Sequence, residues 1–386
     1  MPISSGFVSR NGSSFQLDGN PVRLVGANNY YLGYASRTMV EAVFSLAARL
    51  NLNVLRTWAF LDCGVAVPGS MPVGSKDGVY FHFWNPDTAR PDFNDGPNGL
   101  ERLDQVIALA ETYGLRLILT FANNWPDFGG IEQYLRWFGV SGHHQFFQHP
   151  DVKQAYRMYV EHLLTRVNKI TGRRYTDEPA ILAWELMNEP RCVDDEGRPV
   201  AGGLDTLIAW IEEMSAFVKG LDGNHLTCVG DEGFFHRTGA GAHPLYNGSY
   251  GVDTERILGV PTVDFGTCHL YPTFDPAEDA ITFGQRWIRE HIEAGQRANK
   301  PMLIEEYGYA INHDDEEAKQ RRDVVFQSWL NQVLQGNGSG AALWMIASVT
   351  DDGSLYPDYD HYTVYTADEV ASILAFSQGL NAGDAD

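Results

Sequence analysis

The feature of this sequence that most constrains its fold is an alternation of short apolar runs with helical patterns. Eight apolar runs have the length of buried strands, near residues 22–27, 53–58, 115–121, 180–187, 225–230, 264–270, 301–306 and 341–346. Helical patterns lie near residues 38–50, 99–113, 152–170, 204–220, 280–299, 315–335 and 367–378. Such alternation predicts parallel strands joined by crossover helices. Eight strands predict closure into a (β/α)8 barrel, an α/β fold.

The N-terminal segment carries two turn signals, Asn11-Gly12 and Asp18-Gly19-Asn20. They predict a short β-hairpin within residues 1–20 that caps one end of the barrel. The chain has 386 residues and contains no linker, low-complexity segment or internal repeat. Because barrels with inserted loops commonly exceed about 250 residues as one unit, we expect residues 1–386 to form a single domain.

Two connections are unusually long and rich in Gly, Pro and Asp, namely residues 62–98 and 231–264. Loops of this size in a compact domain are usually functional or disordered. Each follows the carboxyl end of a predicted strand, and barrel enzymes place their chemistry at that face. We therefore expect both segments to form walls of one cleft. The aromatic run Val79–Trp84 in the first segment predicts a wall that shortens it.

The charge balance is strongly acidic, with 28 Lys plus Arg against 50 Asp plus Glu, a net charge of -22 and a pI near 4.8. Without a basic patch, nucleic acid and anionic membranes are not expected as partners. A neutral or cationic ligand fits better. The chain also has 9 Trp, 18 Tyr and 20 Phe. These rings suit a cleft that stacks on flat apolar ligand faces, although core packing accounts for many of them.

Four cysteines, Cys63, Cys192, Cys228 and Cys268, lie far apart and form no CxxC pair. A zinc or redox motif is therefore not expected, and buried free thiols are favoured over a disulfide. We expect neither a metal nor a cofactor. The N-terminal residues lack the basic and apolar regions of a signal peptide. The protein is expected to be soluble and intracellular, or secreted with its signal absent from this sequence.

One strand ends in a carboxylate. Residues 181–187 are mostly apolar, and Asn188-Glu189-Pro190 follow directly. Pro190 cannot continue a central strand, because it lacks the N–H and biases its predecessor towards extended or turn geometry. Asn188 and Glu189 are therefore expected where strand becomes loop, at the rim of the barrel where chemistry is usually found.

A second strand also ends in acid, in the sequence Glu305-Glu306-Tyr307-Gly308. Side chains alternate along a strand, so Glu305 and Glu306 are predicted to point in opposite directions. We assign Glu306 to the site and Glu305 to packing or an ion pair. Two carboxyls in one pocket need different environments: apolar surroundings keep one protonated near neutral pH, while hydrogen bonds and a cation keep the other ionised.

Further polar and aromatic side chains lie near strand ends. Arg56 ends an apolar strand, where an arginine is costly unless paired; a surface ion pair is the alternative. His269 and Tyr271 share one face of the sixth strand. The Tyr271 hydroxyl could donate to an ionised carboxylate, and His269 could hold a carboxyl or a ligand hydroxyl. Trp344 ends the eighth strand, where it forms a ligand floor or packs in the core.

Taken together, these motifs resemble the retaining β-mannanases of glycoside hydrolase family 5, within the clan of (β/α)8 glycosidases. The resemblance covers nearly the whole chain. Its motifs are Gly26-Ala27-Asn28-Asn29-Tyr30-Tyr31, Leu55-Arg56-Thr57-Trp58, Trp184 to Cys192, His269-Leu270-Tyr271-Pro272, Glu306-Tyr307-Gly308 and Trp344. Asn-Glu-Pro alone is a weak signal, whereas six motifs in the proper order are a strong one.

The resemblance implies roles for individual residues. Glu189 would be the acid/base and Glu306 the nucleophile. Asn188 would bond the 2-hydroxyl of the sugar in the -1 subsite, and Arg56 and Tyr271 would steady Glu306. The remaining implied residues line that subsite or the cleft beyond it: His269, Trp344, Asn124, Trp125, Trp58 and Tyr30.

The expected function is therefore hydrolysis of β-1,4-mannosidic bonds in mannan or manno-oligosaccharides, with retention of configuration, by a monomer. Three alternatives stay open. The long segment 62–98 favours an exo-β-mannosidase that acts on short manno-oligosaccharides. A β-1,4-glucanase could use the same scaffold. A non-catalytic barrel that binds oligosaccharides is disfavoured, because Glu189, Glu306, Arg56 and Tyr271 are present together.

Overall fold

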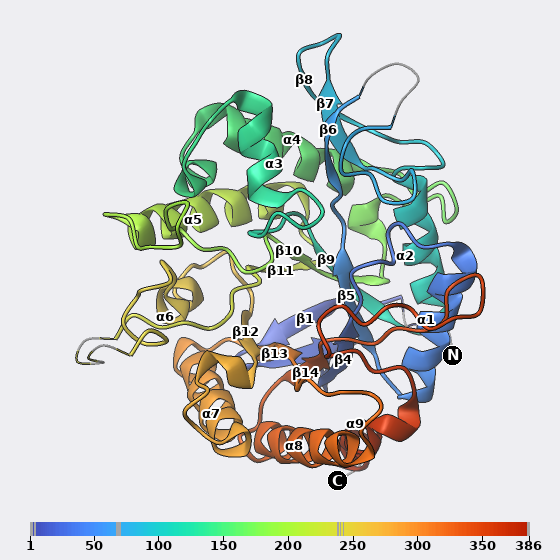
Figure 1. The fold of residues 1–386 in the computed structure, drawn as a ribbon, viewed down its shortest axis with the longest axis vertical. Helices are drawn as coiled ribbons and strands as arrows, with labels where there is room; N and C mark the ends of the chain where they lie inside the picture. Colours follow the sequence, from blue (N-terminus) through green and yellow to red (C-terminus); the bar gives the residue numbers. More distant parts are fainter. Residues whose placement is uncertain are drawn as a thin grey trace.

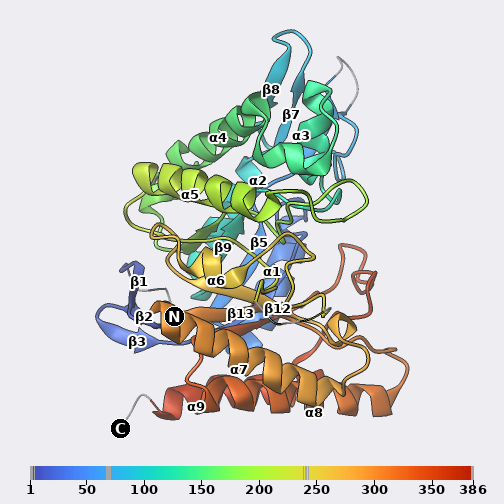
Figure 2. The same cartoon turned by 90° about the vertical axis from the view of Figure 1, so that its left-hand side faces the viewer.

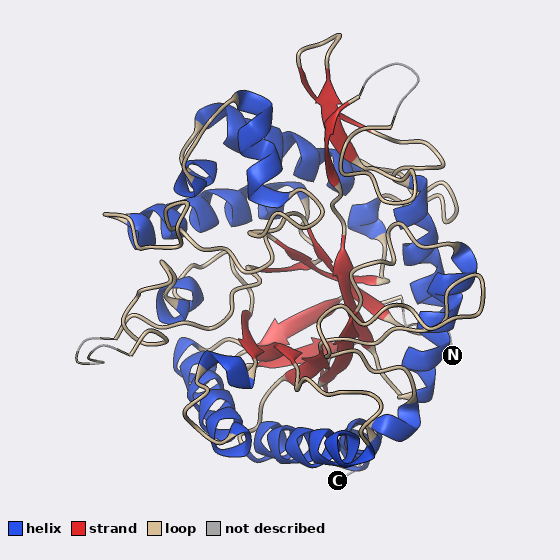
Figure 3. Cartoon of the chain, viewed as in Figure 1, coloured by secondary structure: helices blue, strands red, loops and turns tan. Residues whose placement is uncertain are grey.

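The computed structural model describes residues 3, 5–66, 71–237, 239, 241 and 243–383. At its centre is one sheet of eight parallel strands with helices around it (Figures 1 and 3). The strands are β4 (Leu24–Asn28), β5 (Val54–Trp58), β9 (Arg116–Thr120), β10 (Ile181–Glu185), β11 (Leu226–Cys228), β12 (Gly266–Leu270), β13 (Met302–Tyr307) and β14 (Gly340–Leu343). Their order in the sheet follows the sequence, and β14 pairs with β4. The predicted (β/α)8 barrel is confirmed.

Seven of the eight neighbouring pairs are joined by a parallel ladder, and the β11–β12 junction is joined differently. There the Asp264 amide donates to the Thr227 carbonyl at 2.8 Å, and the His269 amide donates to the Glu232 carbonyl at 3.0 Å. The ring is therefore closed by isolated backbone hydrogen bonds at this point.

The helices of the described chain pack around the barrel. They are α1 (Arg37–Arg49), α2 (Glu101–Tyr113), α3 (Gly130–Phe138), α4 (Pro150–Thr165), α5 (Gly203–Leu221), α6 (Thr254–Leu258), α7 (Ala280–Ala298), α8 (Glu316–Gln335) and α9 (Ala371–Gly383). Short 3-10 helices are η1 (His143–Phe147), η2 (Tyr175–Asp177), η3 (Pro272–Phe274) and η4 (Ala367–Glu369). The seven predicted helices are present, but α4 ends at Thr165 rather than 170. The short helices α3 and α6 were not predicted.

Local sequence explains where several helices begin. Ser36 precedes α1, and its hydroxyl accepts from the Met39 amide. Asp279 and Asp315 do the same for α7 and α8, each accepting from two backbone amides. Such side chains satisfy amides that have no partner inside the helix. The faces that α7 and α8 turn inwards carry Trp287 and Trp329, both fully buried.

A small antiparallel sheet covers the amino end of the barrel (Figure 2). It consists of β1 (Val8–Asn11), β2 (Ser14–Leu17) and β3 (Asn20–Val22), so the predicted hairpin gains a third strand. Phe15 is fully buried and meets Phe265 edge to face, with ring centroids 5.1 Å apart. This sheet and side chains from six barrel strands form one apolar cluster that closes this end.

Segment 62–98 is not simply a loop. It contains β6 (Asp62–Val65), β7 (His82–Asn85) and β8 (Arg90–Phe93), which form a sheet that projects from the barrel (Figure 1). Phe81 and His82 are buried, and the His82 ring stacks on Tyr159 of α4 at 4.7 Å. These aromatic residues therefore pack into the layer of helices.

The four cysteines are free and buried, which confirms the expectation for Cys228 and Cys268 in the core strands. Among the described residues, no helix combines the length and apolar character that crossing a bilayer requires.

Candidate active site

A cleft of about 1260 Å³ opens at the carboxyl ends of the barrel strands. Most residues singled out in the sequence reach it. Its lining includes Tyr30, Trp58, Trp125, Asn188, Glu189, Tyr271, Glu306 and Trp344. Arg56 and His269 lie below this surface and are fully buried.

Glu189 lies in the turn after β10, with a left-handed backbone (φ 52°) that is unfavourable for a residue other than glycine. Its amide donates to the Gly230 carbonyl at 2.8 Å, which holds the turn. One carboxylate oxygen, Oε1, lies 2.6 Å from His269 Nδ1, and Oε2 accepts from Trp125 Nε1 at 2.6 Å. Both oxygens of Glu189 are therefore fixed by neighbours at the cleft.

Glu306 lies in β13, and here the prediction of alternating side chains is wrong. Cys268 pairs with Ile304, but the next residue, His269, pairs with Glu306. This one-residue shift is a β-bulge. It brings both Glu305 and Glu306 to the inside of the barrel, where they lie 3.5 Å and 2.6 Å from the Arg56 guanidinium.

Arg56 is the cation that organises the base of the site. Its guanidinium binds Glu185 with two hydrogen bonds of 2.7 Å and Glu306 Oε1 with one of 2.6 Å. It also donates to Asn188 Oδ1 at 2.8 Å and to Asn28 Oδ1 at 3.0 Å. A surface ion pair is excluded, because only 1 % of the arginine is exposed.

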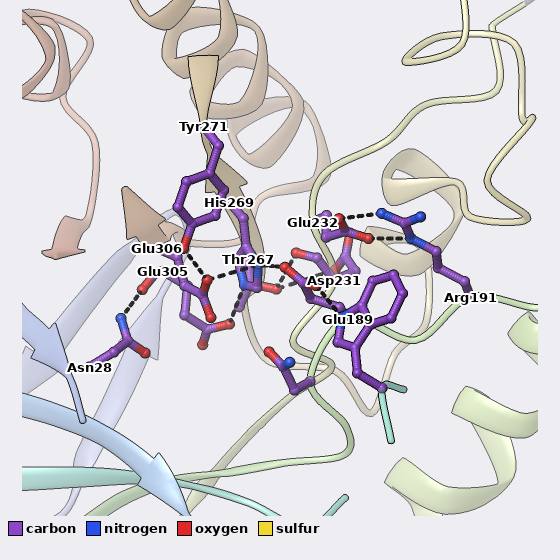
Figure 4. Close-up of polar contacts among 12 residues, drawn as sticks. Asn28, Glu189, Arg191, Asp231, Glu232, Thr267, His269, Tyr271, Glu305 and Glu306 are labelled. Carbon is purple, nitrogen blue, oxygen red and sulfur yellow. Dashed lines mark hydrogen bonds and ion pairs between the residues drawn. The ribbon is translucent and has the colours of Figure 1, made fainter. Parts of the chain in front are cut away.

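His269 connects the two carboxylates (Figure 4). Its Nδ1 lies 2.6 Å from Glu189 Oε1 and 3.5 Å from Glu306 Oε2. One oxygen of Glu189 and one of Glu306 lie within 4.8 Å of each other. Retaining glycosidases hold their carboxyls about 5 to 5.5 Å apart, whereas inverting enzymes need about 6.5 to 9.5 Å. The close approach of the two carboxylates here is typical of the retaining class.

The charges of this group control its protonation. Burial lowers the pKa of His269, but the charge of Glu306 and the hydrogen bond to Glu189 outweigh it and raise the pKa well above the ordinary value. Burial raises the pKa of Glu189, yet His269 lowers it below the usual range. Burial also raises the pKa of Glu306, and the charge of Glu189 adds to this. A proton is therefore held on His269, between two interacting carboxylates.

Tyr271 and Trp344 complete the site beside Glu306. The Tyr271 hydroxyl donates to Glu306 Oε2 at 2.6 Å, and burial raises its pKa, so it remains a donor. Trp344 Nε1 donates to Asp360 Oδ2 at 2.8 Å, which fixes the indole. The rings of Trp58 and Tyr30 lie 6.0 Å and 6.1 Å from that of Trp344. Together these three rings form an aromatic floor.

Asn124 does not line the cleft, which corrects the expectation for this residue. Its side-chain oxygen accepts from the Arg191 amide at 3.0 Å and faces His143 Nε2 at 2.9 Å, so it braces the neighbouring loop. The preceding residue, Asn123, lines the cleft instead. Its Oδ1 accepts from Asn188 Nδ2 at 3.0 Å, and it thereby orients the Asn188 amide.

The sequence interpretation missed one ion pair in the cleft. Arg191 and Glu232 form two hydrogen bonds of 2.6 Å, and the guanidinium lies over the ring of Trp125 at 5.0 Å. Arg191 directly follows Pro190, and Glu232 begins the second long segment. The sequence did carry a signal for this ion pair, because a residue of opposite charge follows each of two predicted strands.

The first long segment contributes less to the cleft than expected. Of its described residues, only Lys76 and Asp77 line the cleft, and the aromatic run Val79–Trp84 does not. The prediction of an aromatic wall that shortens the cleft is therefore wrong.

A parallel (β/α)8 barrel with two carboxylates at this spacing and an aromatic floor defines a glycoside hydrolase of the retaining class. A family model described as GH family 5 beta-mannosidase-like matches residues 5–350. The chain belongs to this family of glycoside hydrolases.

Curated relatives and solved structures agree with this membership. The chain is 35% identical to a probable mannan endo-1,4-beta-mannosidase A of Aspergillus flavus, over 95% of this chain and 88% of that one. It is 32% identical to the mannan endo-1,4-beta-mannosidase A of Aspergillus aculeatus, over 97% and 93%. The endo-1,4-beta-mannanase structure from Rhizomucor miehei is similar with a TM-score of 0.85 at 32% identity, covering 98% of this chain and 100% of that one.

Proposed function

We propose that this protein is an endo-acting β-1,4-mannanase that works with retention of configuration. The observation that carries the proposal is the pair Glu189 and Glu306, whose oxygens lie within 4.8 Å of each other beside His269 at the base of a long cleft. The substrate follows from the family and from relatives named as mannan endo-1,4-beta-mannosidases over most of the chain.

In the first step Glu306 attacks the anomeric carbon, and the bond from that carbon to the glycosidic oxygen breaks. Glu306 suits this role because Arg56 and Tyr271 hold its two oxygens. Glu189 gives a proton to the departing oxygen. That proton comes to Glu189 from His269 Nδ1 across their 2.6 Å hydrogen bond.

In the second step the roles of the carboxylates follow from microscopic reversibility. Glu189 removes a proton from a water molecule, and the water oxygen attacks the anomeric carbon. The ester bond to Glu306 breaks, and Glu306 leaves as a carboxylate. Tyr271 and Arg56 stabilise the charge that returns to it.

The neighbouring residues position the sugar. Trp344, Trp58 and Tyr30 offer apolar faces on which a pyranose ring stacks. The Asn188 amide is held by Arg56 on one side and by Asn123 on the other, so that it can bond a hydroxyl beside the anomeric carbon.

The endo mode is supported by the extent of the cleft on both sides of the carboxylates. Beside Glu189 the lining continues through Trp125, Arg191 and Glu232. Beyond the aromatic floor it continues through Tyr34 and Phe128. A cleft whose lining extends this far beyond the two carboxylates accommodates several sugars, as cleavage inside a chain requires.

The test is the early product profile from mannohexaose, sampled before secondary cleavage. We expect dimers, trimers and tetramers from the start. Mannose plus mannopentaose alone would instead identify an exo-β-mannosidase. Carboxymethylcellulose serves as the parallel substrate for the glucanase alternative, and its preferential hydrolysis would refute mannan specificity.

A further inference from the structure

Glu305, which the mechanism above does not use, lies directly below the two carboxylates (Figure 4). It is fully buried. Among the described side chains, it is the one carboxylate with both oxygens buried and without a hydrogen-bond partner. Leaving a buried charged oxygen unpaired costs more than the roughly 1 to 3 kcal/mol of a neutral polar group, so this arrangement needs an explanation.

The unpaired carboxylate faces an unpaired nitrogen. His269 Nε2 is buried and also has no hydrogen-bond partner, and it lies 3.5 Å from Glu305 Oε2. Arg56 Nε is equally far from Glu305, but it already donates to Glu185 at 2.7 Å. The charge of Arg56 therefore acts on Glu305 as well, but His269 Nε2 is the nearby cationic N–H that has no other acceptor.

The two nitrogens of His269 face in opposite directions. While Nε2 faces Glu305, Nδ1 lies 2.6 Å from Glu189. A protonated imidazole carries an N–H at both positions, so one ring can meet both carboxylates only in its charged form.

We propose that Glu305 is a positioning residue that keeps His269 protonated, with Nδ1–H directed at Glu189. It does not touch the substrate. Through His269 it sets the pH at which Glu189 can no longer obtain the proton for the departing oxygen. This inference rests on the proposed function, because it assigns a role within the same reaction.

Several other charged groups surround the pair. Those that face His269 or Glu305 are Glu189 and Glu185 from β10 and its turn, Glu306 from β13, Arg56 from β5, and Asp231 and Glu232 after β11, together with the neutral thiols of Cys228 and Cys268. From α7, Trp287 donates to the His269 carbonyl at 2.8 Å. Glu185 binds Arg56 and also lies beside Glu305, and burial with the charge of Glu305 raises the pKa of Glu185 to about 8, while Glu232 binds Arg191. Glu305 is the carboxylate left for Nε2.

The ionisation of Glu305 agrees with this role. Burial raises its pKa, but the charge of Arg56 and the hydrogen-bonding position of His269 lower it below the ordinary value. Glu305 therefore carries a negative charge when His269 carries a positive one. Removing that negative charge lowers the pKa of His269. The imidazole then loses, at a lower pH, the proton that Nδ1 directs at Glu189.

The test is Glu305→Gln, which keeps the volume of the side chain and removes its charge. For mannohexaose we expect the alkaline limb of the kcat/KM profile to move down by about 1 to 2 pH units, the shift typical of an opposite charge within ~6 Å. For an aryl β-mannobioside with a dinitrophenolate leaving group, which needs no proton, the glycosylation rate should stay within about threefold.

Glu305→Asp is the matched control, because it keeps the charge and should keep the alkaline limb near its wild-type position. An unmoved limb in a folded Glu305→Gln protein, or equal slowing of both substrates, would overturn the proposal. Imidazole nitrogen shifts of wild-type His269 give a second readout that needs no variant. A neutral ring at pH 7 would also overturn it.

The experiment separates this inference from the proposed function. A wild-type protein that does not cleave mannohexaose refutes the function. An active wild type with an unmoved alkaline limb in Glu305→Gln refutes only the role of Glu305.

Discussion

Removing the Tyr271 hydroxyl should separate the two steps of the reaction. The hydroxyl donates to Glu306 Oε2 at 2.6 Å. Hydrogen bonds to charged groups contribute about 1.5 to 3 kcal/mol. In Tyr271→Phe, Arg56 still holds the other oxygen of Glu306. We therefore expect the ionised form of Glu306 to lose about 2 kcal/mol of stabilisation, in the lower half of that range.

This energy predicts two measurable changes. The hydroxyl stabilises the ionised form of Glu306, so its loss raises the pKa of that carboxyl, by about 1.5 units at 1.36 kcal/mol per unit. Glu306 must be ionised to attack, and the acid limb of kcat/KM therefore moves up by the same amount. When Glu306 leaves the covalent intermediate, its returning charge no longer has the Tyr271 hydroxyl as a donor. This second step therefore slows roughly 30-fold.

Two assays check these changes. The first is the pH profile of kcat/KM for mannohexaose. The second is a stopped-flow assay with an aryl β-mannobioside, in which slow release of Glu306 gives a burst of phenolate equal to the enzyme concentration. Tyr246→Phe is the matched control, because its hydroxyl donates to a carboxylate, Glu290 Oε2, at 2.9 Å away from the carboxylate pair. An unmoved acid limb without a burst in Tyr271→Phe would refute the assigned role of Glu306.

Three further predictions follow from contacts of the site. Glu189→Gln should lower kcat on mannohexaose by about 10²- to 10⁴-fold with little change in binding, and steady-state kinetics with calorimetry would expose wild-type turnover as a contradiction. Trp125→Phe removes a donor to ionised Glu189 and raises its pKa, so the alkaline limb should move to higher pH in the same profile; an unmoved limb would mean that this bond does not matter. Gly230→Ala places a Cβ 2.4 Å from Glu185 Oε1 at φ +90° and should cost more than about 1 kcal/mol of unfolding free energy, whereas Gly223→Ala, with open space around it, should melt like the wild type.

The barrel could be predicted from the sequence because its strands are buried on both faces. Each of the eight barrel strands therefore reads as a mostly apolar run with a helix after it. The sheet β6–β8 was not predicted, because its strands are short and separated by Gly, Pro and Asp. Helix α3 was missed for a similar reason, since it begins at Gly129 and Gly130, which both have positive φ.

The residues of the site also fall into those that local sequence predicts and those that it does not. Glu189 and Glu306 could be found because each ends an apolar strand. The position of Glu305 could not, because a bulge depends on the register with neighbouring strands and not on the residue itself. The pairing of Arg191 with Glu232 depends on how the loops after the neighbouring strands β10 and β11 meet, which no local pattern encodes.

The β11–β12 junction affects the distance between Glu189 and Glu306, and this distance decides whether the product keeps the anomeric configuration of the substrate. Glu189 follows β10 and Glu306 lies in β13, so the shorter path between them around the ring crosses this junction. The retaining and inverting separations of the carboxyls differ by as little as about 1 Å. The carboxylate spacing is held by two backbone hydrogen bonds across the junction, by hydrogen bonds of the Asp264 and Thr267 side chains, and by His269, which contacts both carboxylates. Backbone bonds survive most substitutions, so we expect changes at His269, or at Asp264 and Thr267, to be the ones that alter the carboxylate spacing and with it the anomeric form of the product.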